Sequence, residues 1–173
     1  MDMNFCRRCG KPLTHIKDHL YQCTDGHTIY GNQSPAVGVF FVSSDCQRVL
    51  LTVRGIDPGK GMLGAPGGFL DAKETFEEAI AREVREEISL DPVDYGNLSY
   101  LTSQYDGYAY KEESLPVITV LFWAMLENED KLKSADEVQA VSWHPLASVD
   151  FEQVHAADVR GGLRTLQKLL EDS

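Results

Sequence analysis

The segment from residue 74 to residue 90 constrains this chain most, because it joins a helical apolar stripe to a dense set of carboxylates. Thr75 and Glu78 have the spacing of a capping box, so a helix is expected to begin there. Six glutamates lie between positions 74 and 87, against Arg82 and Arg85. The apolar residues recur every four positions, the spacing of one helix face, at Phe76, Ile80, Val84 and Ile88.

Three of these glutamates are expected to share one side of the helix. On a helical wheel Glu83, Glu86 and Glu87 fall in an arc of about 100° beside the apolar stripe, with Glu87 at its edge. Like charges three and four residues apart repel by roughly a few tenths of a kcal/mol when exposed, and by more when desolvated. This arrangement favours a bound cation, and carboxylate oxygens suit Mg²⁺ or Mn²⁺. The alternative is an acidic face that is only solvated.

The rest of the chain predicts a mixed α/β (α+β) fold with a sheet between helices. Residues 1 to about 30 show little hydrophobic periodicity, whereas strand-like apolar runs begin at Pro35. Asp150 onward is expected to be helical, with Gly161 and Gly162 weakening or breaking that helix. A loop is expected over residues 54–68, and strands over 36–42, 48–53, 95–102, 117–126 and 137–143.

The spacing around the acidic helix resembles that of the Nudix hydrolases. Their box has Gly, five residues, Glu, seven residues, Arg-Glu, an apolar residue, any residue, Glu-Glu, any residue, Gly and an apolar residue. This chain supplies Gly68, Glu74 and the run Arg82-Glu83-Val84-Arg85-Glu86-Glu87-Ile88-Ser89-Leu90. Ser89 is the one departure, and it stands where the pattern has the glycine that ends the helix. The resemblance implies an α/β/α sandwich with a mixed sheet over residues 33–173.

The same resemblance implies roles for these residues. The family reaction is attack of water on a phosphorus atom of a nucleoside diphosphate linked to another moiety. Glu74 and Arg82 would form an orienting salt bridge, and one glutamate would act as general base, although the sequence does not decide which. Glu137 matches a further acidic ligand of some relatives, with a solvated loop residue as the alternative. The divalent metals would be held by Glu83, Glu86, Glu87 and the Gly68 carbonyl.

Three of the four cysteines lie in the first 23 residues, which favours a metal site over disulfides in a reducing compartment. Cys6 and Cys9 have the spacing of a metal-binding knuckle, and Cys23 opens a second turn. A tetrahedral zinc site needs a fourth ligand, for which we favour His27. The alternatives are Asp25, His15 and His19, or a ribbon that no longer binds metal.

This segment is similar to the N-terminal zinc ribbon of Nudix enzymes of the NADH pyrophosphatase type. There a Tyr-x-Asn-x-x-Pro stretch leads into the first strand, and Tyr30, Asn32 and Pro35 fit it. The fourth cysteine of that pattern is missing here. The resemblance implies a zinc ribbon over residues 1–32, a structural Zn²⁺ and a homodimer, since ribbon-containing relatives are commonly homodimers.

Substrate contacts are expected outside the box. Tyr105 and Tyr108 follow Ser103-Gln104, the part of the NADH-type Ser-Gln-Pro-Trp-Pro-Phe-Pro motif that this chain retains. Their rings are suited to stack on adenine or nicotinamide, and ordinary strand alternation is the alternative. Arg54 lies in the loop that enters the box, where a guanidinium is able to reach phosphate oxygens. A solvated loop cation is the alternative there.

Charge and hydropathy limit the kinds of partner that the chain is expected to bind. The formal net charge of −11 argues against nucleic acid, but not against a small anionic substrate, because a bound divalent metal inverts the local field. No apolar run approaches the roughly 20 residues of a membrane helix. No secretory pattern opens the chain, so we expect a cytoplasmic protein without a membrane partner.

These observations, with the resemblance, predict a pyrophosphohydrolase that uses Mg²⁺ or Mn²⁺ and carries structural Zn²⁺. Its substrate would be NADH, ADP-ribose or a related nucleotide diphosphate derivative. One alternative is a house-cleaning NTP pyrophosphatase. Another is a non-catalytic module that senses a nucleotide, against which the three intact glutamates argue, since a sensor has no need of all three.

Overall fold

A computed structural model describes residues 3–110 and 113–171, with the side chains of residues 109, 110 and 113 left aside. It divides the chain into two compact units. One unit runs up to Ser34 and includes Gly107–Val117. The other comprises Pro35–Asp106 and the chain from Ile118 onward. The assignment of residues 33–173 to one domain stays a prediction.

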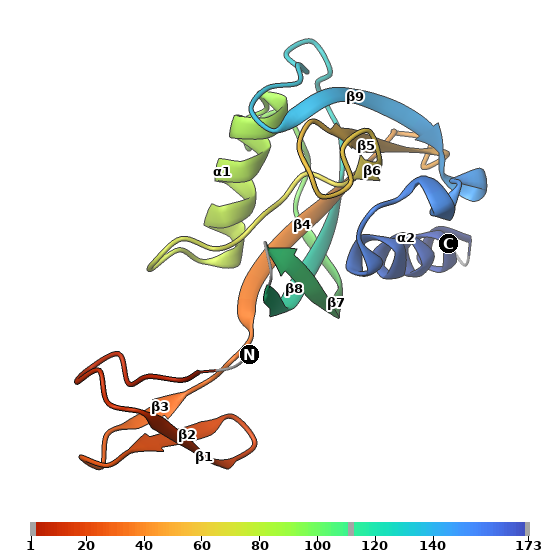
Figure 1. Cartoon of the computed structure of the whole chain (residues 1–173). Helices are drawn as coiled ribbons and strands as arrows, with labels where there is room; N and C mark the ends of the chain where they lie inside the picture. The colour runs from red at the N-terminus through yellow and green to blue at the C-terminus, as the bar shows by residue number, and fades with distance from the viewer. Residues whose placement is uncertain (1–2, 111–112, 172–173) are drawn as a thin grey trace. The chain divides into compact units, whose positions relative to one another are not determined.

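The first unit holds a small antiparallel sheet, shown in Figure 1. Its strands are β1 (Leu13–Lys17), β2 (Leu20–Cys23) and β3 (Thr28–Tyr30), in the order β1-β2-β3. Among the described residues of this unit, the buried cluster consists of Cys6, Cys23 and Ile29, with a few half-buried neighbours. So small a core needs a further constraint such as a metal ion.

The second unit is built on a six-stranded mixed sheet. The order is β6-β5-β4-β8-β7, and β9 pairs with β5. The strands are β4 (Ser34–Val42), β5 (Arg48–Arg54), β6 (Leu63–Gly64), β7 (Ser99–Tyr110), β8 (Glu113–Met125) and β9 (Val138–Pro145). Residues 107–110 of β7 and 113–117 of β8 are counted with the first unit. Strand β4 lies in the middle of this order, which explains why its side chains from Ala36 to Val42 are buried on both faces.

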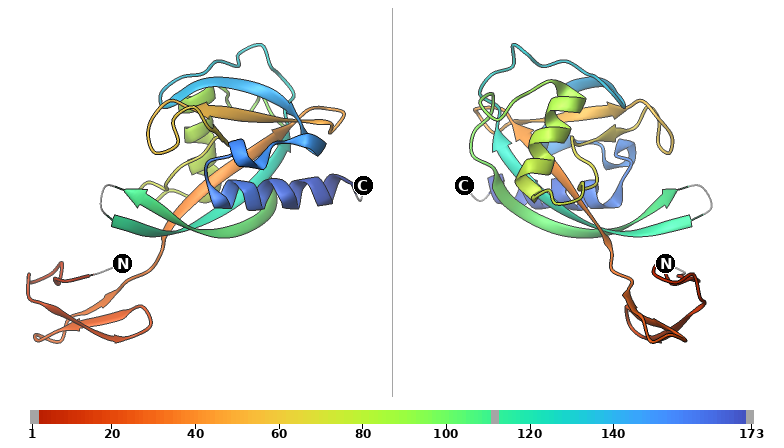
Figure 2. Two further views of the ribbon diagram at one scale, coloured as in Figure 1. Left: turned by 45° about the vertical axis from the view of Figure 1, so that its right-hand side comes forward. Right: turned by 90° about the vertical axis from the view of Figure 1, so that its left-hand side faces the viewer.

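Two helices cover the two faces of this sheet, as Figure 2 shows. They are α1 (Phe76–Ile88) and α2 (Ala157–Glu171), with short 3₁₀ turns at Leu146–Ser148 and Phe151–Gln153. Side chains of β4 alternate between two cores, because successive strand residues point to opposite faces. Phe41 packs in the core under α1, whereas Phe40 packs in the core under α2. The expected α/β/α sandwich is confirmed.

The ends of α1 follow the sequence pattern. Thr75 is the N-cap, and its hydroxyl accepts from the Glu78 N–H while the Glu78 carboxylate accepts from the Thr75 N–H. Ser89 ends the helix with φ 61°, the left-handed conformation that the family pattern assigns to glycine. Neither helix in the described part of the chain is long and apolar enough to cross a membrane.

The expected break in the last helix was wrong, because α2 runs through Gly161 and Gly162 without interruption. A methyl group on Gly162 would lie 2.5 Å from a Leu121 methyl carbon and 2.7 Å from a Phe40 ring carbon. Gly162 is therefore where α2 approaches the sheet closely. The expected strands also shift: β7 begins later than residue 95, and the expected loop over 54–68 contains the short β6.

Candidate functional site

Two glycines bring the chain from the central strand to the acidic helix. The Val37 N–H in β4 donates to the Gly68 carbonyl at 2.9 Å. A methyl group on Gly67, whose φ is 148°, would lie 2.2 Å from the Val37 carbonyl oxygen. A methyl group on Gly68 would lie 2.5 Å from a Glu83 carboxylate oxygen. Glycine at both positions therefore lets β4, this loop and α1 meet.

The guanidinium of Arg82 organises the carboxylates of α1. Its Nε and Nη2 atoms donate to the two oxygens of Glu74 at 2.9 and 3.0 Å, so the expected salt bridge is formed. Nη1 donates to Glu83 at 2.7 Å and to Glu86 at 3.2 Å. Nη2 also donates to the Phe69 carbonyl at 3.0 Å. A metal ion that binds Glu83 and Glu86 therefore competes with Arg82 for them.

Glu74 and Glu83 differ in how fully they are compensated. The Arg82 guanidinium and the Asp71 N–H hold the pKa of Glu74 below its ordinary value, so Glu74 is a stable anion. Burial raises the pKa of Glu83, although Arg82 acts in the opposite direction. The charge of Glu74 is thus compensated by groups within the protein, whereas Glu83 is left with a desolvated charge that a cation would stabilise.

Glu87 lies against the same glycine pair. The Gly67 N–H donates to Glu87 Oε2 at 3.1 Å. Burial, opposed by the Gly67 N–H and reinforced by the charges of Glu83 and Glu137, raises the pKa of Glu87 to about 8. A carboxylate that is desolvated and surrounded by other carboxylates is a suitable ligand for a divalent cation.

The donors around Gly68 fit a hard divalent cation. Carboxylate oxygens come from one face of α1, and the Gly68 carbonyl has a second lone pair beyond the one that accepts the Val37 N–H. All are oxygens, the ligand type that Mg²⁺ and Mn²⁺ prefer. The structure therefore assembles Gly68, Glu83 and Glu87 in one place, with Glu86 on the exposed side of Arg82.

Glu137 reaches the same region from the loop before β9. The Ala135 N–H, two residues before Glu137, donates to the Glu87 carbonyl at 2.8 Å, so the loop that carries Glu137 contacts the turn of α1 that carries Glu87. The Gly55 N–H donates to the Glu137 carbonyl at 2.7 Å, and a methyl group on Gly55 would lie 2.7 Å from that oxygen. Gly55 and Gly67 were not expected as site residues. The pair Gly67-Gly68 before the helix is a sequence feature that points to Gly67, whereas nothing near Gly55 in the sequence marks that residue.

The three residues expected to contact the substrate have less support from the structure than the carboxylates have. Arg54 ends β5 and donates from Nε to the Pro58 carbonyl at 2.9 Å, so part of its guanidinium orders its own loop. Tyr105 lies on β7 and is 63% exposed, which suits a stacking surface. Tyr108 is half-buried and belongs to the other compact unit. Contact of these three side chains with a substrate stays a prediction.

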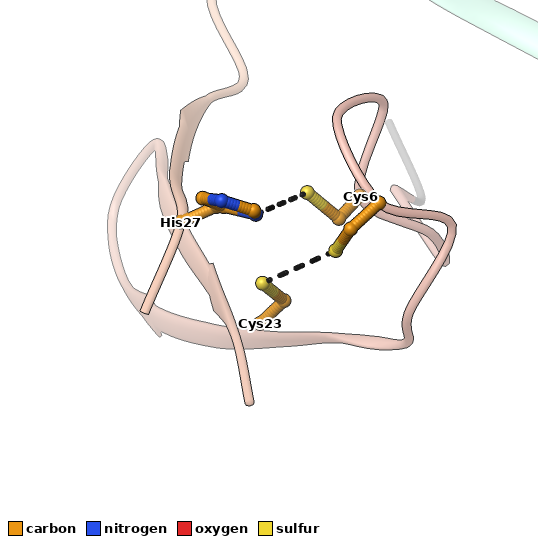
Figure 3. Close-up of side chains that lie close together, drawn as sticks. Cys6, Cys23 and His27 are labelled. Carbon is orange, nitrogen blue, oxygen red and sulfur yellow. Dashed lines mark hydrogen bonds between the residues drawn. The ribbon is translucent and has the colours of Figure 1, made fainter. Parts of the chain in front are cut away.

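The first unit contains a second group of candidate ligands, which Figure 3 shows converging. The ligand atoms of Cys6, Cys9, Cys23 and His27 all lie within 4.8 Å of one another. Cys6 Sγ is 3.8 Å from His27 Nδ1, and the Sγ atoms of Cys9 and Cys23 are 3.7 Å apart. Zinc–ligand bonds of about 2.0–2.3 Å imply tetrahedron edges of about 3.3–3.8 Å, so these two pairs have the separations expected in a zinc site.

Local backbone geometry explains why His27 is the fourth member. Each turn contains a glycine with positive φ: Gly10, directly after Cys9, at 73°, and Gly26, three residues after Cys23, at 76°. Gly26 occupies the place of a second cysteine three residues after Cys23, and its N–H donates to the Cys23 carbonyl at 2.9 Å. Burial raises the pKa of Cys6, but backbone N–H groups and the Cys9 and His27 side chains outweigh it, and the pKa falls to about 6. A thiolate is the form that binds zinc.

Comparison with known proteins decides the family. The profile described as NUDIX domain matches residues 32–164. This chain belongs to the Nudix family. A curated relative, the human protein named NAD(P)H pyrophosphatase NUDT13, mitochondrial, is 37% identical over 102 residues, which cover 58% of this chain and 28% of the relative.

Two further proteins extend the likeness. The NAD-capped RNA hydrolase NudC of Chromobacterium violaceum is 30% identical over 141 residues, covering 80% of this chain and 49% of NudC. The chain thus spans less than half the length of these curated relatives. A solved Nudix hydrolase from Nitrosomonas europaea superposes with a TM-score of 0.67 at 24% identity, covering 98% of this chain and 92% of that one. At that identity the likeness supports the fold.

Proposed function

We propose that this Nudix chain is a divalent-metal-dependent pyrophosphohydrolase. The observation that carries the proposal is the convergence of Glu83 and Glu87 on the Gly67–Gly68 backbone, at the start of the family's box. Two desolvated carboxylates on one side of the helix favour a cation there. The metal ligands would be Gly68, Glu83, Glu86, Glu87 and Glu137.

The reaction would consume one water per bond broken. The water oxygen attacks a phosphorus atom, the anhydride P–O bond breaks, and a carboxylate of the site accepts the proton. When bound, Mg²⁺ or Mn²⁺ would acidify this water and stabilise the attacking and leaving oxygens. Arg82, held by Glu74, would keep Glu83 and Glu86 in their orientation through its two Nη1 contacts.

The substrate would be a nucleoside diphosphate joined to a second group. Two relatives carry names that state such substrates, NAD(P)H and NAD-capped RNA, and in both the bond would lie within a nicotinamide adenine dinucleotide. Arg54 would contact the phosphates and Tyr105 a base. The negative charge of the chain favours the small molecule over the RNA.

A substrate panel tests this proposal. NADH, NAD⁺, ADP-ribose, a short RNA with a 5′-NAD end and the common nucleoside triphosphates would each be incubated with Mg²⁺ or Mn²⁺. We expect AMP, or an RNA with a 5′-phosphate, from the diphosphate-linked compounds. Release of pyrophosphate from triphosphates alone would favour the NTP pyrophosphatase. Binding of ADP-ribose without hydrolysis of any compound would favour the sensor and overturn the proposal.

The cysteine cluster would hold a structural zinc ion. Its four members supply the donor types of a closed tetrahedral site, three sulfurs and one imidazole nitrogen. The ion would replace the core that the β1–β3 unit lacks, because metal binding contributes directly to the folding free energy of such small units. No catalytic role is needed for a site with four protein ligands.

A further inference from the structure

Residues 127–137 form the loop between β8 and β9, which we call the acid loop because it ends on Glu137. This loop lies against the C-terminal end of α1. The Ala135 N–H donates to the Glu87 carbonyl at 2.8 Å, and the Lys133 N–H donates to the Ile88 carbonyl at 3.2 Å. The last carbonyls of a helix have no partner within the helix. The acid loop therefore caps the same turn of α1 that carries Glu87.

Asp94 anchors the beginning of this loop. Its side chain is only 3% exposed, and its two oxygens accept from Asn128 Nδ2 and Lys131 Nζ, each at 3.3 Å. The Asp91 N–H also donates to Asp94 at 2.9 Å. The Asp94 carbonyl accepts from the N–H groups of Glu127 and Asn128 at 3.1 and 2.9 Å. Asp94, in the segment that precedes β7, thus binds the loop through both its backbone and its carboxylate.

Three further contacts hold the rest of the acid loop in place. Leu132 packs against the core beneath α1. Glu129 accepts from Trp143 Nε1 in β9 at 3.0 Å. The carbonyl of Glu137 accepts from the Gly55 N–H. A loop fixed at its start, middle and end leaves the carboxylate of Glu137 a narrow range of positions relative to Glu87.

We propose that Asp94 is a positioning residue that holds the acid loop on α1 and thereby places Glu137 beside Glu87 for metal binding. The proposal rests on the proposed function, because it requires both glutamates to serve one metal site. Asp94 itself contacts neither the metal nor the substrate. It acts through the amides of Lys133 and Ala135, which fix the loop relative to the helix.

The test compares Asp94→Asn with Asp45→Asn. Asn keeps the shape of Asp94 but removes the charge that Lys131 and the Asp91 N–H contact. Asp45 is a matched control, because its carboxylate also stabilises a turn, accepting from the Ser43 hydroxyl and from the Gln47 N–H between β4 and β5. Two quantities are measured on the whole chain: amide hydrogen exchange across residues 127–137, and Mn²⁺ binding followed by electron paramagnetic resonance.

In Asp94→Asn we expect exchange across the acid loop to accelerate about 10-fold and the half-saturating Mn²⁺ concentration to rise about 10-fold. Asp45→Asn should change neither. Faster exchange with unchanged Mn²⁺ binding would overturn the proposal, because Asp94 would then be structural only. Equal changes in both variants, or in neither, would also overturn it, as would a wild-type chain that binds no Mn²⁺.

Two further arms keep the test decisive. If Asp94→Asn does not fold, Lys131→Met removes one contact from a side chain that is 52% exposed. It should raise the half-saturating Mn²⁺ concentration by a smaller factor, and no rise would contradict the proposal. If the wild-type chain binds Mn²⁺ but hydrolyses no compound in the panel, the proposed function fails while the Asp94 comparison still stands.

Discussion

Arg82 shows how one residue sorts chemically identical side chains into different roles. It gives two parallel hydrogen bonds to Glu74 and single ones to Glu83 and Glu86. Bidentate pairing is the stronger arrangement, so Glu74 is the fixed partner. The single contacts are the ones that a divalent cation displaces at lower cost. Burial sets Glu87 apart, since its pKa rises to about 8 where Arg82 makes no contact with it.

The Glu74–Arg82 pair predicts a pH-dependent stability. Arg82 holds the pKa of Glu74 below its ordinary value of about 4.3. The stabilisation is therefore present above that ordinary pKa and is lost as pH falls through the depressed one. Glu74→Gln should lower Tm at pH 7, and this loss should shrink as the pH falls below about 4.3, in thermal melts at pH 7 and at the lowest pH at which the wild-type chain is folded. Glu77→Gln, an exposed change on the same helix, is the control, and an equal Tm loss at both pH values would contradict the assignment.

At the scale of elements, the two helices of the sandwich differ in how far their own sequence defines them. Helix α1 follows its apolar period and its capping box, so local sequence suffices to define it. Helix α2 contains two glycines that weaken a helix in isolation, yet it is continuous. Packing of Gly162 on Phe40 and Leu121 explains the difference, since a side chain there would separate the helix from the sheet.

Gly162→Ala and Gly161→Ala form a matched pair that tests this packing. Alanine gains about 1 kcal/mol of helix propensity at either position. At Gly162 the new methyl meets Leu121 and the ring of Phe40, and overpacking is expected to lower the free energy of unfolding by about 1–3 kcal/mol. At Gly161 it meets the end of Gln104, a flexible side chain that can turn away. Urea unfolding should rank Gly161→Ala as the more stable variant, and the reverse order would refute the packing argument.

Ser89 provides a prediction in the opposite direction. It ends α1 with φ 61°, a conformation that costs a residue other than glycine about 1–2 kcal/mol. Ser89→Gly should therefore raise the free energy of unfolding by about 1 kcal/mol and Tm by about 2–4 °C, without a change in metal binding. Ser89→Ala keeps the strain and is the control. A Tm for Ser89→Gly at or below wild type would show that Ser89 has another role.

How far the sequence predicts this chain depends on the range of the interaction. The glutamate face of α1 and the candidate zinc ligands Cys6, Cys9, Cys23 and His27 follow from local spacing, and the structure brings the members of each group together. The uninterrupted α2 depends on contacts with β4 and β8, and no pattern within residues 157–171 contains them. Gly55 and Asp94 acquire their contacts only when distant loops meet, so their positions in the sequence do not reveal these contacts.

At the scale of the whole molecule, two compact units have different sources of stability. The sheet unit has two apolar cores, one under each helix. In the β1–β3 unit, the buried cluster found among the described residues has three members, two of which are candidate metal ligands. Removal of a metal should therefore affect the units unequally. The homodimer and the cytoplasmic location stay predictions from the resemblance and the composition.

Elemental analysis of the purified chain should find about one zinc per chain. Cys23→Ser should lose it, whereas Cys46→Ser, a change in the sheet unit, should retain it. A strong chelator should abolish amide protection in β1, β2 and β3 while protection in β4 and β5 persists, because the metal supplies most of the folding free energy of the small unit. Absence of zinc, or unchanged protection of β1–β3 after chelation, would contradict this assignment.

The central claim is that the carboxylates of α1 support hydrolysis, and one rate comparison tests it most directly. The diphosphate that the wild-type chain cleaves fastest in the panel is given to Glu86→Gln and Glu77→Gln with saturating Mg²⁺. Both are glutamates on the exposed side of the same helix, so neither change disturbs the core. We predict that Glu86→Gln lowers kcat by about 100-fold or more, and that Glu77→Gln stays within about 2-fold of wild type. A Glu86→Gln chain that works at the wild-type rate would contradict the claim.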